Sequence, residues 1–279
     1  ISPSGWWNTS LTVPMSVQIS DVGSGLDTAS ALYRISTDGG TGWGDWSPAS
    51  CSGNNGSNGT ETVSTSVSFE GDSGTLFWVQ FSVADMAAQR SESPVYPVKV
   101  DTTPPQNPPA VNSNLTTSTW WGDAEITLSW DPGTDATSGV AGYSLRWDTL
   151  PSTVPNTTVD DEDNHIEDLI PDHGQSWNYH LRTVDQAGNA AAGGVHTGPY
   201  WLDPPPPVNP AISSGLPQPF SWSTATTVSC TWSAATDVGS GIAGYSYEWT
   251  GSQGTLPDPT VDTTQTSAGS SILANGSWY

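Results

Sequence analysis

The sequence predicts an all-β protein built as a tandem array of antiparallel β-sandwiches, and three observations support this fold class. A hinge of similar sequence occurs three times, as "SDVGSGL" at 20–26, "TDATSGV" at 134–140 and "TDVGSGI" at 236–242. The second and third copies begin 114 and then 102 residues after the copy before, which is the size of one small domain. Short runs with period-two alternation flank the hinges, and no helical period of 3.6 is present.

Two half-buried strands are expected around the second hinge, at 124–130 and 141–147, because apolar and polar residues alternate strictly there. The third repeat copies both strands, at 227–232 and 243–249. Further strands are expected at 77–85, 95–100 and 177–185. This density of short strands between turn signals indicates two sheets packed face to face in each repeat.

Proline-rich segments close the first two repeats, "DTTPPQNPP" from 101 and "DPPPPVNP" from 203, and such sequence favours stiff spacers. The predicted domains are therefore 1–103, 104–203 and 204–279. Comparison of the repeats predicts that the first lacks its N-terminal strand and that the third lacks its last strands. The chain is thus expected to be an excised piece of a longer array, with the open edge of the third repeat covered by further polypeptide.

The composition excludes some partners. The chain has 28 acidic and five basic residues, a net charge of −23, which argues against nucleic acid because phosphate binding needs clustered Lys and Arg. No apolar stretch of 18 residues occurs, so no membrane insertion is expected within the segment. Cys51 and Cys230 fall in different repeats and are expected to be free or buried thiols.

A family resemblance rests on four features: the Asp-x-x-Ser-Gly-apolar hinge, the aromatic strand after it, "DQAGN" at 185–189, and "DTTPP" at 101–105. Together they resemble the immunoglobulin-like and fibronectin type III-like repeats of large secreted or surface-anchored prokaryotic proteins. The resemblance covers nearly the whole chain and implies spacers, adhesion modules or carbohydrate-related modules. The first repeat departs from the pattern, with "DMAAQ" at 85–89.

The hinge aspartates Asp21, Asp135 and Asp237 have two interpretations. Each can accept backbone N–H groups in an Asx-turn, and the glycine four residues later can reach positive φ without steric cost. The alternative is a site for a hard cation, because carboxylate-rich turns suit Ca²⁺, although no spacing matches an EF-hand loop.

Calcium is the one cofactor that the sequence suggests. The acidic run at 159–168 contains Asp160, Asp161 and Asp163, which predict either a solvated loop or a weak calcium site. The four histidines show no metal-ligand spacing, and no motif for nucleophilic catalysis or phosphate binding is present, so the chain is not expected to be an enzyme.

Tryptophan is abundant, with 15 residues. Neighbouring residues on a strand face opposite sides, so the pairs at 6–7 and 120–121 cannot both enter one core. Trp7, Trp78 and Trp121 are predicted to lie at interfaces between repeats or to stack on sugars. Six sequons make Asn8, Asn55, Asn58, Asn114, Asn156 and Asn275 candidate glycosylation sites.

These observations lead to two functional hypotheses. The first is a non-catalytic structural or adhesive segment of a long extracellular or cell-surface repeat protein, which acts as a spacer, surface or filament module. Its partners would be further repeats or neighbouring copies of the same protein. The alternative is a carbohydrate-binding accessory region of a secreted polysaccharide-degrading enzyme, with polysaccharide as the partner.

Overall fold

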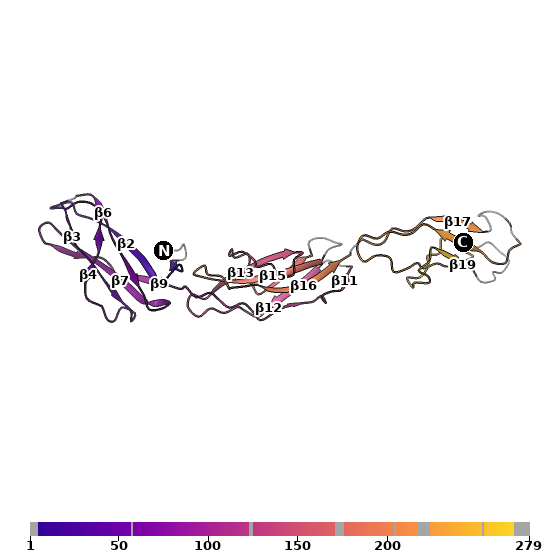
Figure 1. Cartoon of the computed structure of the whole chain (residues 1–279), viewed down its shortest axis with the longest axis horizontal. Coiled ribbons are helices and arrows are strands. Elements are labelled where there is room, and N and C mark those ends of the chain that lie inside the picture. The colour runs from indigo at the N-terminus through magenta and orange to yellow at the C-terminus, as the bar shows by residue number, and fades with distance from the viewer. Residues whose placement is uncertain are drawn as a thin grey trace. The chain divides into compact units, whose positions relative to one another are not determined.

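The structure is a computed structural model that describes residues 5–56, 58–122, 125–170, 176–203, 205–216, 222, 224–252 and 254–270. Every regular element in these residues is a β-strand, so the all-β prediction is confirmed (Figure 1). The strands form five sheets and pair mainly antiparallel. No membrane-spanning helix is present in the described part of the chain.

Contacts between residues divide the chain into two compact units, each of which is described by itself. The first unit comprises 1–113, 127–166 and 178–197. The second comprises 114–126, 167–177 and 198–279. The domain limits expected after residues 103 and 203 remain predictions.

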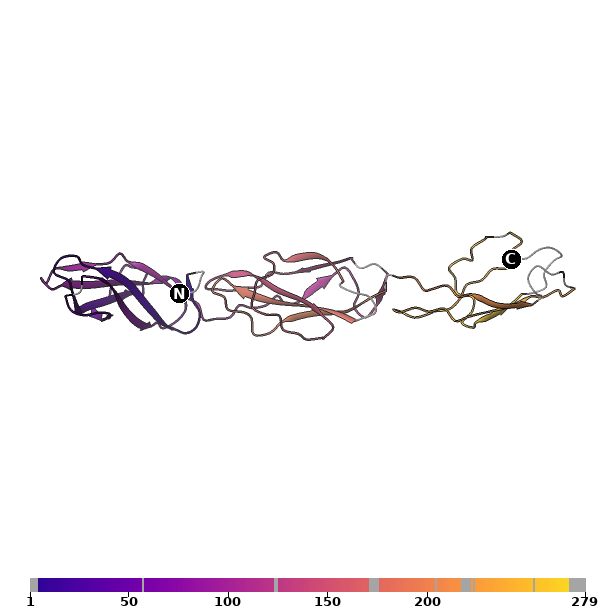
Figure 2. The ribbon, with the colours of Figure 1, turned by 90° about the horizontal axis from the view of Figure 1, so that it is seen from above.

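The first hundred residues form two sheets around one hydrophobic core (Figures 1 and 2). One sheet has the order β1-β9-β7-β3-β4, with β8 beside β7, and the other has the order β2-β6-β5. The strands are β1 (Trp6–Trp7), β2 (Thr12–Ser20), β3 (Leu26–Ser36), β4 (Ser47–Pro48), β5 (Ser50–Cys51), β6 (Thr60–Ser68), β7 (Ser73–Asp85), β8 (Arg90–Glu92) and β9 (Tyr96–Val100).

The core of these two sheets follows the alternation in the sequence. Phe77, Val79, Phe81 and Val83 of β7 are all buried, as the period-two pattern predicts. Phe69 stacks on Phe77 with 4.2 Å between the ring centroids, which fills the space between the sheets with aromatic carbon.

The next strands form two further sheets, with the orders β10-β12-β14 and β11-β16-β15-β13. Trp130 of β12 packs edge-on against Tyr143 of β13, with ring centroids 5.3 Å apart, so this aromatic pair joins the two sheets. The strands are β10 (Val111–Ser113), β11 (Trp120–Trp121), β12 (Glu125–Trp130), β13 (Val140–Asp148), β14 (His165–Leu169), β15 (Ser176–Asp185) and β16 (Val195–Leu202).

After residue 203, the described chain forms one sheet of β17 (Ile212–Leu216), β18 (Ser229–Trp232) and β19 (Ser267–Gly269). The strand expected at 243–249 is not formed, and Tyr245 makes only an isolated bridge to Thr263. In the second repeat, the equivalent strand β13 pairs along its length with β15. The described residues beyond 203 contain no counterpart of β15, so the segment has no strand to pair with.

The other expected strands are confirmed within a few residues. The strands predicted at 77–85, 95–100, 124–130, 141–147 and 177–185 correspond to β7, β9, β12, β13 and β15. The run at 227–232 is shorter than expected and begins at Ser229.

Two hinge glycines provide a matched test of the turns. Gly25 and Gly139 have φ of +81° and +82°, which strains an alanine by about 1–2 kcal/mol. A Cβ on Gly25 would also overlap the backbone of Gly56, whereas at Gly139 the nearest atom would be Gln186 Nε2 at 3.7 Å. We expect Gly25→Ala to reduce hydrogen-exchange protection in β3 and β7 more than Gly139→Ala reduces it in β13 and β15. Equal losses would contradict the role of the Gly56 contact.

Candidate metal centre

Each hinge is an aspartate turn, as the Asx-turn interpretation predicts. The Asp135 Oδ1 atom accepts the N–H groups of Thr137, Ser138 and Gly139 at 3.1, 2.9 and 2.8 Å. The other two hinges make the same bonds with fewer donors: Asp21 Oδ2 accepts Gly23 N at 3.0 Å and Gly25 N at 2.6 Å, and Asp237 Oδ2 accepts Gly239 N at 3.1 Å and Gly241 N at 2.7 Å.

Asp185 ends β15 and begins the turn at 185–189. Its Oδ1 accepts the backbone N–H of Asn189 at 2.8 Å, and its Oδ2 accepts the Asn189 side-chain amide at 2.8 Å. The same amide also donates to the main-chain carbonyl of Asp101 at 2.9 Å. The turn at 185–189 therefore binds both Asp185 and Asp101, the first residue of the linker.

Asp101 begins the linker and is completely buried. Its Oδ1 accepts Thr103 N at 3.2 Å, and its Oδ2 accepts Ser138 N at 3.0 Å. The Ser138 N–H is thus shared with Asp135, which brings the linker carboxylate against the hinge carboxylate.

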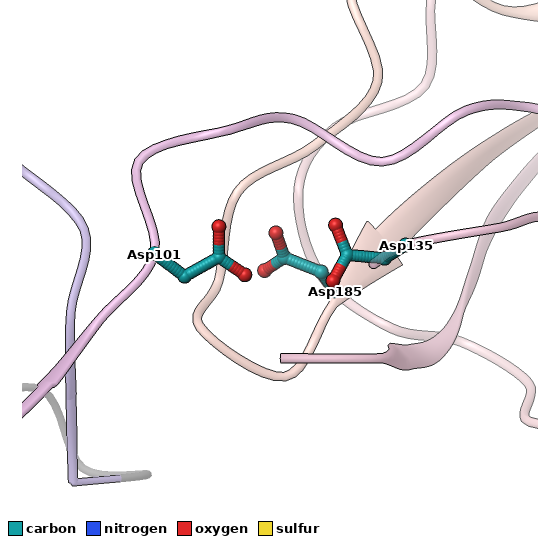
Figure 3. Close-up of side chains that lie close together, drawn as sticks. All are labelled: Asp101, Asp135 and Asp185. Carbon is teal, nitrogen blue, oxygen red and sulfur yellow. The ribbon is translucent and has the colours of Figure 1, made fainter. Parts of the chain in front are cut away.

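The three aspartates form one cluster, in which their carboxylate groups point toward one another (Figure 3). One oxygen from each of Asp101, Asp135 and Asp185 lies within 4.8 Å of the others. Asp101 and Asp185 are 0% and 1% exposed, and Asp135 is half-buried. None of the three takes part in a salt bridge within the described residues.

Burial and mutual repulsion oppose ionisation of this cluster. Burial raises the pKa of Asp101, and the negative charge of Asp135 raises it further. Burial likewise raises the pKa of Asp185, with additional repulsion from Asp101 and Asp135. Without a cation, the repulsion between these carboxylates therefore destabilises the folded chain, and the hydrogen bonds only partly offset this effect.

The donor set fits a hard divalent cation. Ca²⁺ binds oxygen at about 2.4 Å, so two ligands on opposite sides of one ion are about 4.8 Å apart. The oxygens of the cluster meet this limit, and water or carbonyl oxygens would complete the shell. With no imidazole or thiolate among the three ligands, the chemistry favours calcium over zinc.

The aspartates that the sequence suggested for calcium lie elsewhere. Asp160 Oδ2 accepts Leu145 N at 2.8 Å, and Asp161 Oδ1 accepts Asp163 N at 2.9 Å, so these carboxylates bind backbone groups of the adjacent strand and turn. The cluster of Asp101 is the only group of three or more potential metal ligands in the described residues. The calcium prediction at Asp160, Asp161 and Asp163 remains untested.

The sequence places Asp101 in a linker and Asp185 in a turn, and no local pattern joins them to Asp135. The available signal was the spacing of 34 residues between the linker aspartate and the hinge aspartate, because Asp203 and Asp237 repeat the relation of Asp101 and Asp135. Asp203 Oδ2 accepts Ser240 N at 2.7 Å, just as Asp101 accepts Ser138 N.

The predicted interface tryptophans are all half-buried. Trp78 and Trp121 donate their indole N–H groups to nearby carbonyls, of Thr75 at 3.1 Å and Thr116 at 3.0 Å, while Trp7 packs against the first core. The most exposed ring of the adjacent pairs is instead Trp120, at 39%.

The sequence patterns did not predict two clusters of aromatic side chains. Trp120 of β11 lies beside Trp201 of β16, with ring centroids 5.5 Å apart. On β3, the Arg34 guanidinium lies 5.0 Å from the ring centroid of Trp43 and 4.6 Å from that of Trp46.

The candidate glycosylation sites differ in their surroundings. Asn8 is half-buried and donates to the Ala187 carbonyl at 2.8 Å, so a glycan there would disrupt this bond. Asn55, Asn58, Asn114 and Asn156 are exposed, and Asn275 lies outside the described residues. Cys51 and Cys230 are free, and burial raises the pKa of both thiols.

Comparisons with known proteins find one similar enzyme and several similar solved structures. No protein-family model matches the chain. It is 34% identical over 180 residues to Exoglucanase B of Cellulomonas fimi, an alignment that covers 61% of this chain and only 14% of that enzyme. The chain therefore spans about one seventh of the length of this relative.

Solved structures similar to this chain include the fibronectin(III)-like modules of Clostridium thermocellum CbhA, at 13% identity and a TM-score of 0.38. That match covers 71% of this chain and 88% of the other. Domains A168–A170 of titin match at 9% identity and a TM-score of 0.27, covering 94% of this chain and 84% of the other.

The carboxylate cluster predicts an unusual pH dependence. Because the pKa values of Asp101 and Asp185 are raised in the folded chain, these groups favour folding below their ordinary pKa of about 3.9. Their contribution is lost as pH rises through the raised values. Without calcium, the region around β13 and β15 should therefore lose stability as the pH rises above about 4.

Asp135→Asn tests the cluster because one amide oxygen can still accept all three backbone bonds of the turn. We expect this variant to stabilise β13 and β15 at neutral pH without calcium, since one repelling charge is removed. It should also abolish the stabilisation that native protein gains in about 5 mM Ca²⁺, above the ~0.1–1 mM dissociation constants of extracellular calcium modules. Hydrogen exchange with and without chelator measures both effects.

Asp21→Asn is the matched control, because it changes the equivalent turn of the first repeat. It should leave the calcium response of β13 and β15 unchanged. Equal calcium stabilisation of native protein and Asp135→Asn would rule out binding at this cluster.

Proposed function

We propose that this chain is a non-catalytic spacer segment of an extracellular repeat protein, with joints that hold consecutive repeats in a fixed relation. The observation that carries the proposal is the docking of the linker onto the second repeat. Asp101 N donates to Trp7 O at 3.0 Å, while the Asp101 carboxylate and carbonyl accept bonds from Ser138 and Asn189. Asp101, the first residue of the linker, is thus hydrogen-bonded to the first repeat through Trp7 and to the second repeat through Ser138 and Asn189.

Further bonds extend this joint along the linker and across it. Gln106 and Thr134 exchange both backbone hydrogen bonds, at 2.8 and 3.1 Å. Asn107 donates to Gly193 O and accepts from Thr183 N, at 2.7 and 2.8 Å. A segment held by this many hydrogen bonds behaves as a stiff connection, because these bonds must break before the linker can bend.

The same design recurs after the second repeat, which supports a role that depends on repetition. Asp203 N donates to Trp121 O at 2.9 Å, and Val208 pairs with Thr236. These bonds match those of Asp101 with Trp7 and of Gln106 with Thr134.

The proposal also includes a bound calcium ion and an extracellular location. A calcium ion held by Asp101, Asp135 and Asp185 would link the linker to two turns of the second repeat and oppose their repulsion. An exoglucanase acts on a polymer too large to enter a cell, so its similarity to this chain supports placement outside the cell, beside a polysaccharide-degrading enzyme. The proposed partners of the chain are further repeats of its own protein.

A loosened joint provides the test. Asn189→Ala removes the side-chain amide that bonds Asp101 and Asp185, so we expect the linker at 101–109 to become cleavable by a broad-specificity protease at least about tenfold faster. Gln89→Ala changes the equivalent turn residue of the first repeat and should leave the cleavage rate at 101–109 unchanged. Equal rates in native protein and Asn189→Ala would contradict a stiff joint.

Scattering in solution tests the spacer role independently. A compact globule of this length has a radius of gyration of about 19 Å. We expect a clearly larger value for the native chain, because repeats joined by stiff linkers do not collapse on one another. A radius near that of a single globule would overturn the spacer proposal.

The second candidate function is binding of a neutral polysaccharide, and the aromatic group on β3 favours it. Arg34 is fixed by Gln80 Oε1, which accepts its Nε and Nη2 groups at 3.0 and 2.6 Å. Trp43 and Trp46 are held against this cation and remain partly exposed. Rigid rings beside a hydrogen-bonding cation offer both the stacking and the polar contacts that sugars need.

The charge of the chain restricts the ligand to neutral polymers. With a net charge of −23, the protein repels anionic polysaccharides, whereas a glucan carries no charge to repel. The name of the related exoglucanase supports a glucan as the first ligand to test.

Affinity electrophoresis in gels that contain soluble β-glucan or xylan tests this candidate. If the surface binds sugar, Trp46→Ala should weaken retention about tenfold, equivalent to about 1.4 kcal/mol. Trp222→Ala removes a ring that is 96% exposed and lies far along the sequence, and should retain native mobility. Absence of retardation for native protein on every neutral polymer would eliminate this candidate while leaving the spacer proposal intact.

A further inference from the structure

Three titratable side chains form a row on one side of the sheet β11-β16-β15-β13. Asp148 ends β13, His180 lies in β15, and His196 lies in β16. His180 Nε2 is 3.0 Å from Asp148 Oδ1, and His180 Nδ1 is 2.8 Å from His196 Nδ1. His180 is completely buried, whereas His196 reaches the surface.

The chemistry of these groups fixes where the protons lie at neutral pH. An ionised carboxylate only accepts hydrogen bonds, so Nε2 of His180 must carry the proton that faces Asp148. Neutral His180 then has a lone pair on Nδ1. The proton between the two rings therefore belongs to His196 Nδ1, which donates to His180.

The charged groups around His180 come from two strands. Arg146 of β13 pairs with Asp148 Oδ2 at 3.0 Å, and Arg182 of β15 donates to the Ala191 carbonyl at 2.6 Å. The adjoining loops at 149–158 and 186–194 contain no charged or titratable side chain. Burial alone would raise the pKa of Asp148, but hydrogen bonds, including that of His180, lower it to about 2, so the carboxylate stays ionised in mild acid.

We propose that His180 and His196 form a proton-sharing latch that ties β15 to β16 at neutral pH and opens in acid. One added proton is accommodated, because His180 can then donate from Nδ1 to a His196 whose own proton has moved to Nε2. A second added proton leaves N–H groups on both facing nitrogens and places two positive rings 4.9 Å apart. The rings must then separate, which releases the start of β16.

The direction of the pH dependence follows from His196. Burial and the nearby His180 lower the pKa of His196 below its ordinary value. The unfolded chain therefore binds more protons than the folded chain below about pH 6.5. Stability from the latch is present above that pH and is lost as pH falls, by up to tenfold in the folding equilibrium per pH unit for one proton.

The proposal is tested on the full chain with three variants. His196→Asn keeps an N–H group at the position of Nδ1 but cannot become a cation. His196→Ala removes the contact, and His165→Asn is the control, because His165 lies in β14, outside this row of side chains. Exchange protection of β15 and β16 amides, corrected for intrinsic exchange rates, is measured between pH 8 and pH 5.

We expect native protein and His165→Asn to lose protection in acid by up to tenfold per pH unit. His196→Asn should lose little, and His196→Ala should be weakly protected already at pH 8. Nitrogen NMR of the native chain gives a readout that needs no variant, with His180 protonated on Nε2 and His196 on Nδ1 at pH 8. A His180 proton on Nδ1 at pH 8, or equal acid sensitivity of native protein and His196→Asn, would overturn the proposal.

Discussion

The Asp135 carboxylate accepts hydrogen bonds from three backbone N–H groups, and these bonds hold the hinge turn against which the linker at 101–109 docks. This turn presents Ser138 N–H to Asp101, and the Gly139 carbonyl to Gln186 N at the start of the neighbouring turn. The turn at 185–189 positions Asn189, whose side-chain amide donates to the Asp101 carbonyl. One carboxylate therefore organises two loops that bind the linker, and the hinge contact recurs at the next linker, where Asp203 accepts the N–H of Ser240.

The contacts of the five basic residues explain why no Lys or Arg pairs with the carboxylate cluster in the part of the chain that the structure describes. Each has a partner elsewhere: Arg34 on Gln80, Arg90 on Ser82, Lys99 over Trp6, Arg146 on Asp148 and Arg182 on Ala191. These cations stabilise strands and aromatic rings of the two β-sandwiches. The carboxylates at this joint are consequently stabilised by neutral N–H groups, and any cation bound to them would come from solution. The stiffness of the joint would then respond to the composition of the medium, while the sandwiches would not.

Much of the fold could be predicted from the sequence because strand periodicity is local. The alternation of Phe77, Val79 and Phe81 defines a buried face without knowledge of any partner strand. The run at 243–249 has equally good alternation but forms no strand, because pairing is decided by a neighbour. The cluster of Asp101, Asp135 and Asp185 was not foreseen for the same reason. Only the topology of the sheets brings these distant residues together, and no local pattern contains that information.

The parallel pairing of an early strand with the last strand of a sandwich has a mechanical consequence. β1 runs parallel to β9, with Trp6 beside Lys99, and β11 runs parallel to β16, with Trp120 beside Trp201. Tension applied at the start of β1 or β11 and at the end of its partner strand pulls the two strands past each other, so their hydrogen bonds bear load together in shear and do not open one at a time. The aromatic contacts across each pair add resistance to this sliding. Each of these two sandwiches is thus closed by a short parallel strand pair that resists extension in shear.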